Sequence, residues 1–172
     1  MIMKKYFSMI AMALMLATGF TACDVETNEK PGGTNIEKMC GYWDVIWWAV
    51  DANGEILDAW TDGTIFTYNT ADNSTTKMWI DDQGSYYSFK FQCDIDYAAK
   101  TFTAAERDYD AAGSGKAVLT NGKILIGEGK NLHGMPTDSI AFEISFDDDT
   151  YPAKYGFDHY LVTGTKHSGF TE

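Results

Sequence analysis

Two segments of the chain alternate strictly between apolar and polar side chains, and this period of two limits the fold more than any other feature. Residues 86–97 carry one apolar set at alternate positions: Tyr87, Phe89, Phe91, Cys93, Ile95 and Tyr97. Residues 138–147 carry another: Ile140, Phe142, Ile144 and Phe146. Successive side chains of a β-strand point to opposite faces, so this pattern predicts strands with one dry and one wet face.

Residues 41–50 add a strand that is apolar on both faces. Trp43, Val45 and Trp47 share one face, whereas Ile46, Trp48 and Val50 share the other. Tryptophan and β-branched residues favour strands over helices. One face must lie inside the fold, and the other either packs under a loop or is exposed as a binding patch.

Further short strands are predicted between turn signals, at 55–60, 63–69, 75–80, 101–106 and 158–166. The Asn121–Gly122 pair within 116–129 predicts a type I′ hairpin that sets Leu119 opposite Ile124. One helical turn at 35–39 is predicted before the first long strand, opened by a capping box of Thr34 and Glu37.

The predicted strands define an all-β fold over residues 37–172. We expect an up-and-down antiparallel β-barrel of about eight strands, with a short N-terminal helical turn, because closure leaves no free strand edges. A two-sheet sandwich with a filled core meets the same demand. A barrel of this size is able to hold one small ligand.

The N-terminus has the order of a secretory signal. Residues 1–22 combine Lys4 and Lys5 with an apolar run and small residues, and they are predicted to be a signal peptide. The residues before Cys23 resemble a bacterial lipobox, which implies lipidation of Cys23 and anchoring in a membrane. Residues 23–36 are predicted to be a flexible acidic tether. An ordinary cleaved signal and an uncleaved anchor helix are the alternatives.

Charge and cysteine content narrow the classes of partner. The formal net charge is −12, which disfavours nucleic acid as a partner, although acidity also serves solubility alone. Cys40 and Cys93 could form a disulfide outside the cytoplasm, or they are two buried free thiols. No cysteines or histidines have metal-ligand spacing, so neither a metal nor a cofactor is expected.

No catalytic residue is identified from the sequence. His133, His159 and His167 form no H-x-x-x-H pair, and no G-x-S-x-G elbow is present. Carboxylates brought together only by the fold remain open, so enzymatic activity is uncertain and not favoured. The remaining lead is a set of residues that would line a pocket for an apolar ligand: Trp47, Trp48, Phe89, Phe91, Phe142 and Ile144. The alternative is that these residues fill the core completely.

The chain resembles two groups of proteins. Gly41-Tyr42-Trp43 resembles the G-x-W opening of lipocalin-type (calycin) barrels. That resemblance implies that Trp43 packs at the closed end of the barrel, beneath a late basic residue such as Lys166. The lipobox, tether and aromatic β-domain together resemble the Bacteroidetes lipoproteins called lipid-binding putative hydrolases. This second resemblance implies a lipocalin-like barrel and an apolar ligand, and it transfers no catalytic residues.

Three functions follow in order of preference. The first is a lipid-anchored protein at the bacterial outer membrane that binds a small apolar or lipid-like molecule. The second is a surface glycan-binding or assembly module of an outer-membrane uptake system, which would expose coplanar tryptophans outside the barrel. The third is a hydrolase, as the family label implies.

Overall fold

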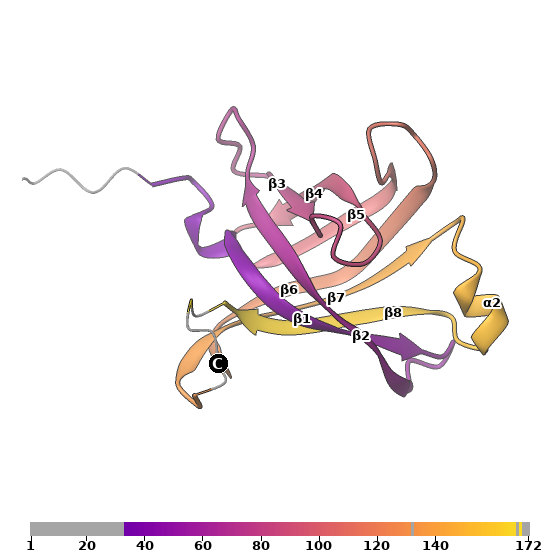
Figure 1. Ribbon diagram of the computed structural model, residues 1–172. Helices are drawn as coiled ribbons and strands as arrows, with labels where there is room; N and C mark the ends of the chain where they lie inside the picture. Colours follow the sequence, from indigo (N-terminus) through magenta and orange to yellow (C-terminus); the bar gives the residue numbers. More distant parts are fainter. Residues whose placement is uncertain (1–32, 132, 168, 170–172) are drawn as a thin grey trace, which may run out of the picture. The chain divides into compact units, whose positions relative to one another are not determined.

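The computed structural model describes residues 33–131, 133–167 and 169. These residues form eight strands, one 3₁₀ turn and one short helix (Figure 1). In chain order the elements are η1 (Glu37–Met39), β1 (Gly41–Val50), β2 (Ile56–Asn69), β3 (Lys77–Asp81), β4 (Lys90–Asp96), β5 (Thr101–Asp108), β6 (Lys116–Lys130), β7 (Pro136–Phe146), α2 (Tyr151–Tyr155) and β8 (His159–Lys166). The predicted signal peptide and Cys23 lie outside the described residues.

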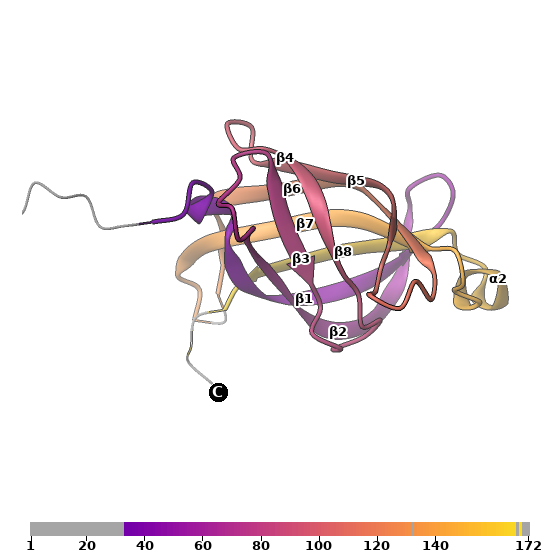
Figure 2. The same ribbon diagram turned by 90° about the horizontal axis from the view of Figure 1, so that it is seen from above.

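The eight strands form a closed barrel in which every strand pairs antiparallel with its neighbours in sequence, and β1 pairs with β8. The predicted up-and-down barrel is therefore confirmed. Figure 2 shows η1 at one end of the barrel and α2 at the other, as does Figure 1. No helix among the described residues is long and apolar enough to cross a membrane.

The alternation in the sequence corresponds to burial in β1 and β7. Trp43, Val45 and Trp47 are buried in β1, and Ile140, Phe142 and Ile144 are buried in β7. These predictions hold because strand geometry alone fixes which side chains share a face.

The strand predicted at 86–97 begins later than expected, at Lys90. Residues 86–88 form a loop instead, because their backbone N–H groups all donate to one carboxylate oxygen of Asp82. Local bonds from an aspartate to nearby backbone compete with a strand ladder in this way.

The hairpin predicted at Asn121–Gly122 is wrong, because β6 runs unbroken from Lys116 to Lys130. Asn121 has a positive φ of 53°, and the register with β7 shifts between Thr120 and Lys123, so the pair forms a bulge instead of a turn. A Cβ on Gly122 would lie 2.4 Å from the carbonyl oxygen of Phe102 on β5. The glycine is therefore needed for close strand packing.

Two other predicted boundaries differ from the structure. The strands predicted at 55–60 and 63–69 form the single strand β2, whose pairing with β1 shifts register between Trp47 and Trp48. Between the strands predicted at 138–147 and 158–166 the chain forms α2, with Pro152 in its first turn and Gly156 as a left-handed C-cap.

The η1 end of the barrel is packed with apolar side chains. Ile36 and Met39 are fully buried, and Asn35 donates its backbone N–H to Asn73. The compact unit thus begins at Gly33, and residues 34–36 at the end of the predicted tether are part of it. The predicted capping box does not form, since the N-cap residue is Ile36 and makes no side-chain cap.

Candidate functional site

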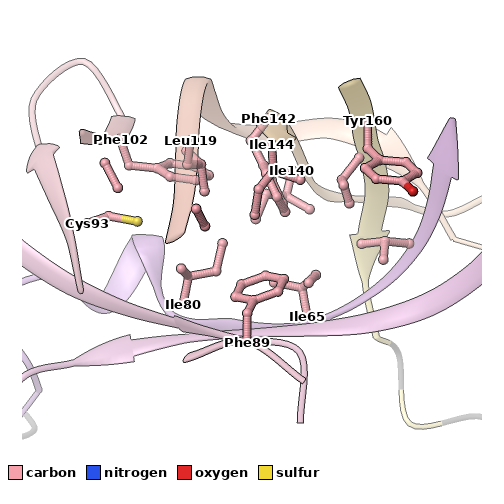
Figure 3. Packing of buried hydrophobic residues seen from close by; sticks show 14 of the residues in the cluster. Ile65, Ile80, Phe89, Cys93, Phe102, Leu119, Ile140, Phe142, Ile144 and Tyr160 are labelled. Carbon is pink, nitrogen blue, oxygen red and sulfur yellow. The ribbon is translucent and has the colours of Figure 1, made fainter. Parts of the chain in front are cut away.

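The interior of the barrel is lined by apolar side chains from all eight strands. Figure 3 shows Phe102, Leu119 and Phe142 on one side facing Ile80, Phe89 and Ile65 on the other. Five of the six predicted lining residues are buried in this core: Trp47, Phe89, Phe91, Phe142 and Ile144. Trp48 is not among them, since it lies on the opposite face of β1 and donates its Nε1–H to Thr163.

The η1 end forms the floor of this interior. Trp43 Nε1 donates to Thr67 Oγ1 over 2.9 Å, and Thr67 Oγ1 donates to the carbonyl of Met39 over 2.7 Å. The Nζ atom of Lys166 lies 5.7 Å from the centre of the Trp43 ring, within the range of a cation–π contact. The G-x-W opening and the late basic residue are therefore arranged as the lipocalin resemblance implies.

The α2 end is closed by a chain of hydrogen bonds. Trp60 Nε1 donates to Tyr86 over 2.7 Å, and Tyr160 donates to Asp149 over 2.7 Å. The hydroxyls of Tyr86 and Tyr160 lie 2.9 Å apart. Because Tyr160 gives its one hydrogen to Asp149, Tyr86 must be the donor between them. The chain thus runs from an indole through two phenols to a carboxylate.

Asp148 joins two further tyrosines at this end. Tyr87 and Tyr109 donate to its two carboxylate oxygens over 2.9 and 2.8 Å. The Tyr87 ring also stacks on Phe146 with 3.7 Å between ring centres. Neither Asp148 nor Asp149 has an ion pair within the described chain. This end of the barrel therefore holds uncompensated negative charge.

The surroundings of these tyrosines keep them protonated. Burial raises the pKa of Tyr86, Tyr87 and Tyr160, and bonds donated to carboxylates add to this effect for Tyr87 and Tyr160. For Tyr109, the hydrogen bond to Asp148 is the main cause and raises the pKa to about 12. All four phenols are therefore neutral hydrogen-bonding groups over the physiological range.

Asp82 shapes the loop that carries Tyr86 and Tyr87. Its fully buried carboxylate accepts backbone N–H groups of Gly84, Tyr86, Tyr87 and Ser88 over 2.7 to 3.1 Å. Gln83 and Ser88 have positive φ angles of 50° and 62°, which non-glycine residues rarely adopt. One carboxylate thus holds residues 82–89, named here the β3–β4 loop, in a strained conformation.

The β3–β4 loop covers a seam in the barrel wall. Within the described sheet, the pairing of β2 with β3 is limited to residues 66–69 of β2. Residues 56–65 of β2 therefore have a strand partner only on their other side, in β1. At this free edge, Ser85 Oγ accepts the Thr64 N–H over 3.1 Å and donates to the Thr64 carbonyl over 3.0 Å. The serine side chain therefore replaces a strand partner.

Trp47 directs an unpaired donor towards the same seam. The residue is fully buried, and its Nε1–H has no hydrogen-bond partner. A Cβ on Gly63 would lie 3.0 Å from Trp47 Nε1 and 3.2 Å from Ser85 Oγ, so the indole N–H edge faces β2 beside the β3–β4 loop. Buried polar groups are normally paired, and an unpaired one in a native protein calls for an explanation.

Both cysteines of the barrel are free thiols, so the structure has no disulfide between Cys40 and Cys93. Cys93 is fully buried, and burial raises its pKa to about 12. Cys40 Sγ instead donates to the carbonyl of Ile36, and burial raises its pKa as well. These positions match the alternative of two free thiols.

The described part of the chain contains no group of three potential metal ligands. His167 lies 2.8 Å from Asp44 and His159 lies 3.0 Å from Asp158, but neither histidine is hydrogen-bonded to a serine, threonine or cysteine side chain in that part. Trp43 and Trp47 are buried and Trp48, Trp60 and Trp79 are half-buried, so none of the five tryptophans is fully exposed as a glycan platform would require.

The sequence interpretation missed the groups at the α2 end. None of Asp82, Ser85, Tyr86, Asp148 and Asp149 is among the site residues that the sequence predicts. One local signal was available, because Asp81-Asp82-Gln83-Gly84 has the composition of an aspartate-stabilised turn. The partners of the tyrosines lie 61 and 74 residues away, and no local pattern indicates them.

The closed antiparallel barrel with its apolar interior defines the class of small eight-stranded barrels, whose interior is either filled by side chains or holds one small ligand. Residues 28–171 match the family described as lipid-binding putative hydrolase, and the chain belongs to this family. Family and fold together fit a lipid-binding, lipocalin-like protein. No curated protein matched the chain.

Proposed function

We propose that this protein binds a small apolar or lipid-like molecule inside its barrel, at the outer membrane of a bacterium, where an acylated Cys23 anchors it. The observation that carries the proposal is the largely apolar core of a closed barrel, in a chain that belongs to a lipid-binding family. The function is carriage or sensing of the ligand, without a covalent step.

Aromatic side chains make this interior suitable for an apolar guest. Trp47 has the rings of Tyr86, Phe89 and Tyr160 within 4.8 to 6.2 Å, and Phe102 lies 5.8 Å from Phe142. Such rings offer large, rigid apolar surfaces that lose little conformational freedom on binding. Displacement of any one of them by a ligand would leave the others in contact with apolar surface.

The N-terminal signal supports the proposed location. Cys23 follows small residues and an apolar run, and the compact unit begins ten positions later at Gly33. Several acyl chains on one terminus give stable anchoring, whereas a single chain gives only marginal binding.

Native mass spectrometry of the protein from its own host tests ligand binding. We expect a bound lipid that is released when the barrel unfolds, in both the wild type and Cys23→Ala. A barrel without a bound lipid that also takes up none from vesicles would contradict the proposal. Metabolic labelling with palmitate tests the anchor separately: label should enter the wild type and be absent from Cys23→Ala.

The same preparation distinguishes the two remaining functions. A glycan-binding module would retain oligosaccharides of the host surface and release them on competition with free sugar. A hydrolase would turn over an ester or glycoside, and its activity would be lost on substitution of Asp44 or His167, the Asp–His pair of the outer face.

A further inference from the structure

The unpaired Nε1–H of Trp47 identifies the end of the barrel at which a ligand's polar group would bind. A buried donor without a partner costs free energy, because it has lost its hydrogen bonds to water. Three neighbouring donors are already used: Trp60 donates to Tyr86, Tyr86 to Tyr160, and Tyr160 to Asp149. Two buried side-chain nitrogens of the described residues have no partner, Trp47 Nε1 and His159 Nε2, and the Trp47 ring is the one that packs against Tyr86 in the interior.

The aromatic side chains that cover Trp47 differ in what holds them. Tyr160 projects from the paired strand β8, whereas Tyr86 and Phe89 belong to the β3–β4 loop and lie 4.8 and 6.2 Å from the Trp47 ring. Tyr87 projects from the same loop. Tyr86 and Tyr87 are both held by Asp82 through their backbone N–H groups and are not part of the strand ladder. Displacing them would therefore break side-chain contacts and the two Ser85–Thr64 bonds but no strand pair.

Charge at this end selects the ligand's polar group. Trp47 Nε1 only donates, so the partner must be an acceptor. Asp149 accepts a hydrogen bond from Tyr160, and Asp148 accepts one from Tyr87. Neither carboxylate forms an ion pair with a lysine, arginine or histidine of the described chain. A carboxylate or phosphate would meet two like charges, whereas an ester carbonyl or a hydroxyl oxygen would not.

We propose that Trp47 Nε1 donates to the uncharged polar end of a lipid-like ligand, an ester carbonyl or a hydroxyl. This polar end occupies the space that Tyr86 and Tyr87 fill in the present structure. The ligand enters through the seam between residues 56–65 of β2 and the β3–β4 loop. This assignment rests on the proposed lipid-binding function and adds to it the site, the ligand class and the route.

The test uses the full chain with Cys23→Ser, labelled with ¹⁵N in its tryptophans, and two probes with the same acyl chain. 1-Monooleoylglycerol is uncharged, and oleate is anionic. We expect 1-monooleoylglycerol to shift the Trp47 indole N–H resonance more than any other indole resonance. Oleate should bind more weakly than 1-monooleoylglycerol by about tenfold or a larger factor. The Trp47 resonance is assigned from its loss in Trp47→Phe.

Substitutions separate the donor from the surrounding apolar surface. Trp47→Phe keeps an aromatic ring and should weaken binding of 1-monooleoylglycerol about fivefold to tenfold. Trp48→Phe removes an indole on the outer face and should leave the affinity unchanged. Tyr86→Phe breaks two bonds that hold the β3–β4 loop and should speed association without weakening the final complex.

The outcomes distinguish this inference from the proposed function. If both probes bind but the Trp47 resonance stays in place, or oleate binds as tightly as 1-monooleoylglycerol, the inference is wrong and lipid binding stands. If neither probe binds, lipid binding itself fails and the inference fails with it. The resonance is measured on the unsubstituted barrel, so the test does not depend on the folding of Trp47→Phe.

Discussion

Lys166 and Trp43, which are 123 residues apart in the chain, meet at the floor of the barrel, with Nζ 5.7 Å from the centre of the indole ring. Gly41 makes this approach feasible. A Cβ at position 41 would lie 3.0 Å from two ring carbons of Trp43 and 3.2 Å from Lys166 Cε. The G-x-W spacing is thus a packing requirement: the glycine leaves room for the ring and the lysine side chain.

Gly41→Ala is expected to destabilise the barrel by about 1–3 kcal/mol, because overpacked sites force neighbours off their preferred rotamers. Trp43 cannot yield easily, since it is fully buried and bonded to Thr67. Urea unfolding followed by tryptophan fluorescence measures the change. Gly113→Ala, in a loop with open space around the glycine but a positive φ of 68°, is the control for backbone strain without crowding and should cost about 1 kcal/mol. Equal losses for both would show that crowding at the floor is unimportant.

Lys166→Met should cost about 1 kcal/mol, because it removes both the cation over Trp43 and the ion pair to Asp138 at 3.6 Å. Lys166→Arg keeps a cation and should restore most of the loss. The stability lost in Lys166→Met should shrink in high salt if the ion pair to Asp138 dominates, and it should persist if the cation–π contact with Trp43 dominates. Urea unfolding at low and at high salt distinguishes the two contributions.

Asp82→Asn tests what holds the β3–β4 loop. The substitution weakens four hydrogen bonds to a buried carboxylate, so the loss should be about 2–4 kcal/mol. The amides of Tyr86, Tyr87 and Ser88 should lose hydrogen-exchange protection first, since their bonds are the ones weakened. Asp72→Asn, at an exposed loop position, is the matched control and should change neither quantity. Unchanged protection of residues 86–88 would mean that other contacts hold the loop.

The contrast between β7 and β6 shows how far the sequence predicts this fold. In β7, the buried residues Ile140, Phe142 and Ile144 stand at every second position, and backbone geometry alone places them on one face. In β6, Asn121–Gly122 has the composition of a hairpin turn, yet Phe102 of another strand packs where a Cβ on Gly122 would be. That contact is non-local, so the local pattern indicated the wrong structure.

The same limit applies to the candidate site. The inward positions of Trp47, Phe91 and Phe142 follow from alternation once the interior face is known. Trp47 and Trp48 are successive residues of one strand and face opposite sides of it. The prediction that both line the pocket is therefore wrong for Trp48, which lies on the outer face. The polar cluster at the α2 end depends on pairs such as Tyr86–Tyr160, which only the closed barrel brings together.

Gly122→Ala should prevent the native barrel from forming, because the added Cβ would lie 2.4 Å from a backbone oxygen that cannot move without breaking β5–β6 pairing. Circular dichroism and soluble yield measure this outcome. Gly127→Ala, in the same strand with open space but a positive φ, should fold with a cost of about 1 kcal/mol. A soluble, fully folded Gly122→Ala would show that β5 and β6 separate more readily than the structure indicates.

Alkaline pH should destabilise the barrel through the tyrosines of the α2 end. Their folded pKa values are raised, to about 12 for Tyr109, whereas an unfolded tyrosine titrates near about 10. Between these values the unfolded chain releases protons that the folded chain retains, so the free energy of unfolding falls as pH rises. Below about pH 10 this contribution is fully present. Urea midpoints from pH 8 to 12 should show the decline, and Tyr109→Phe should make it shallower. A flat profile would contradict the assigned hydrogen bonds.

Thiol titration tests the state of Cys40 and Cys93. Cys93 is fully buried with a pKa raised to about 12, so in native Cys23→Ala it should not react with a thiol reagent near pH 8. Unfolding without reductant should then expose both remaining thiols, because neither is in a disulfide. Cys40→Ser should lower the titre by one. No reactive thiol after unfolding would mean that the two cysteines oxidise in the cell. Since Cys93 lies inside the barrel, such a bond would require the interior to rearrange.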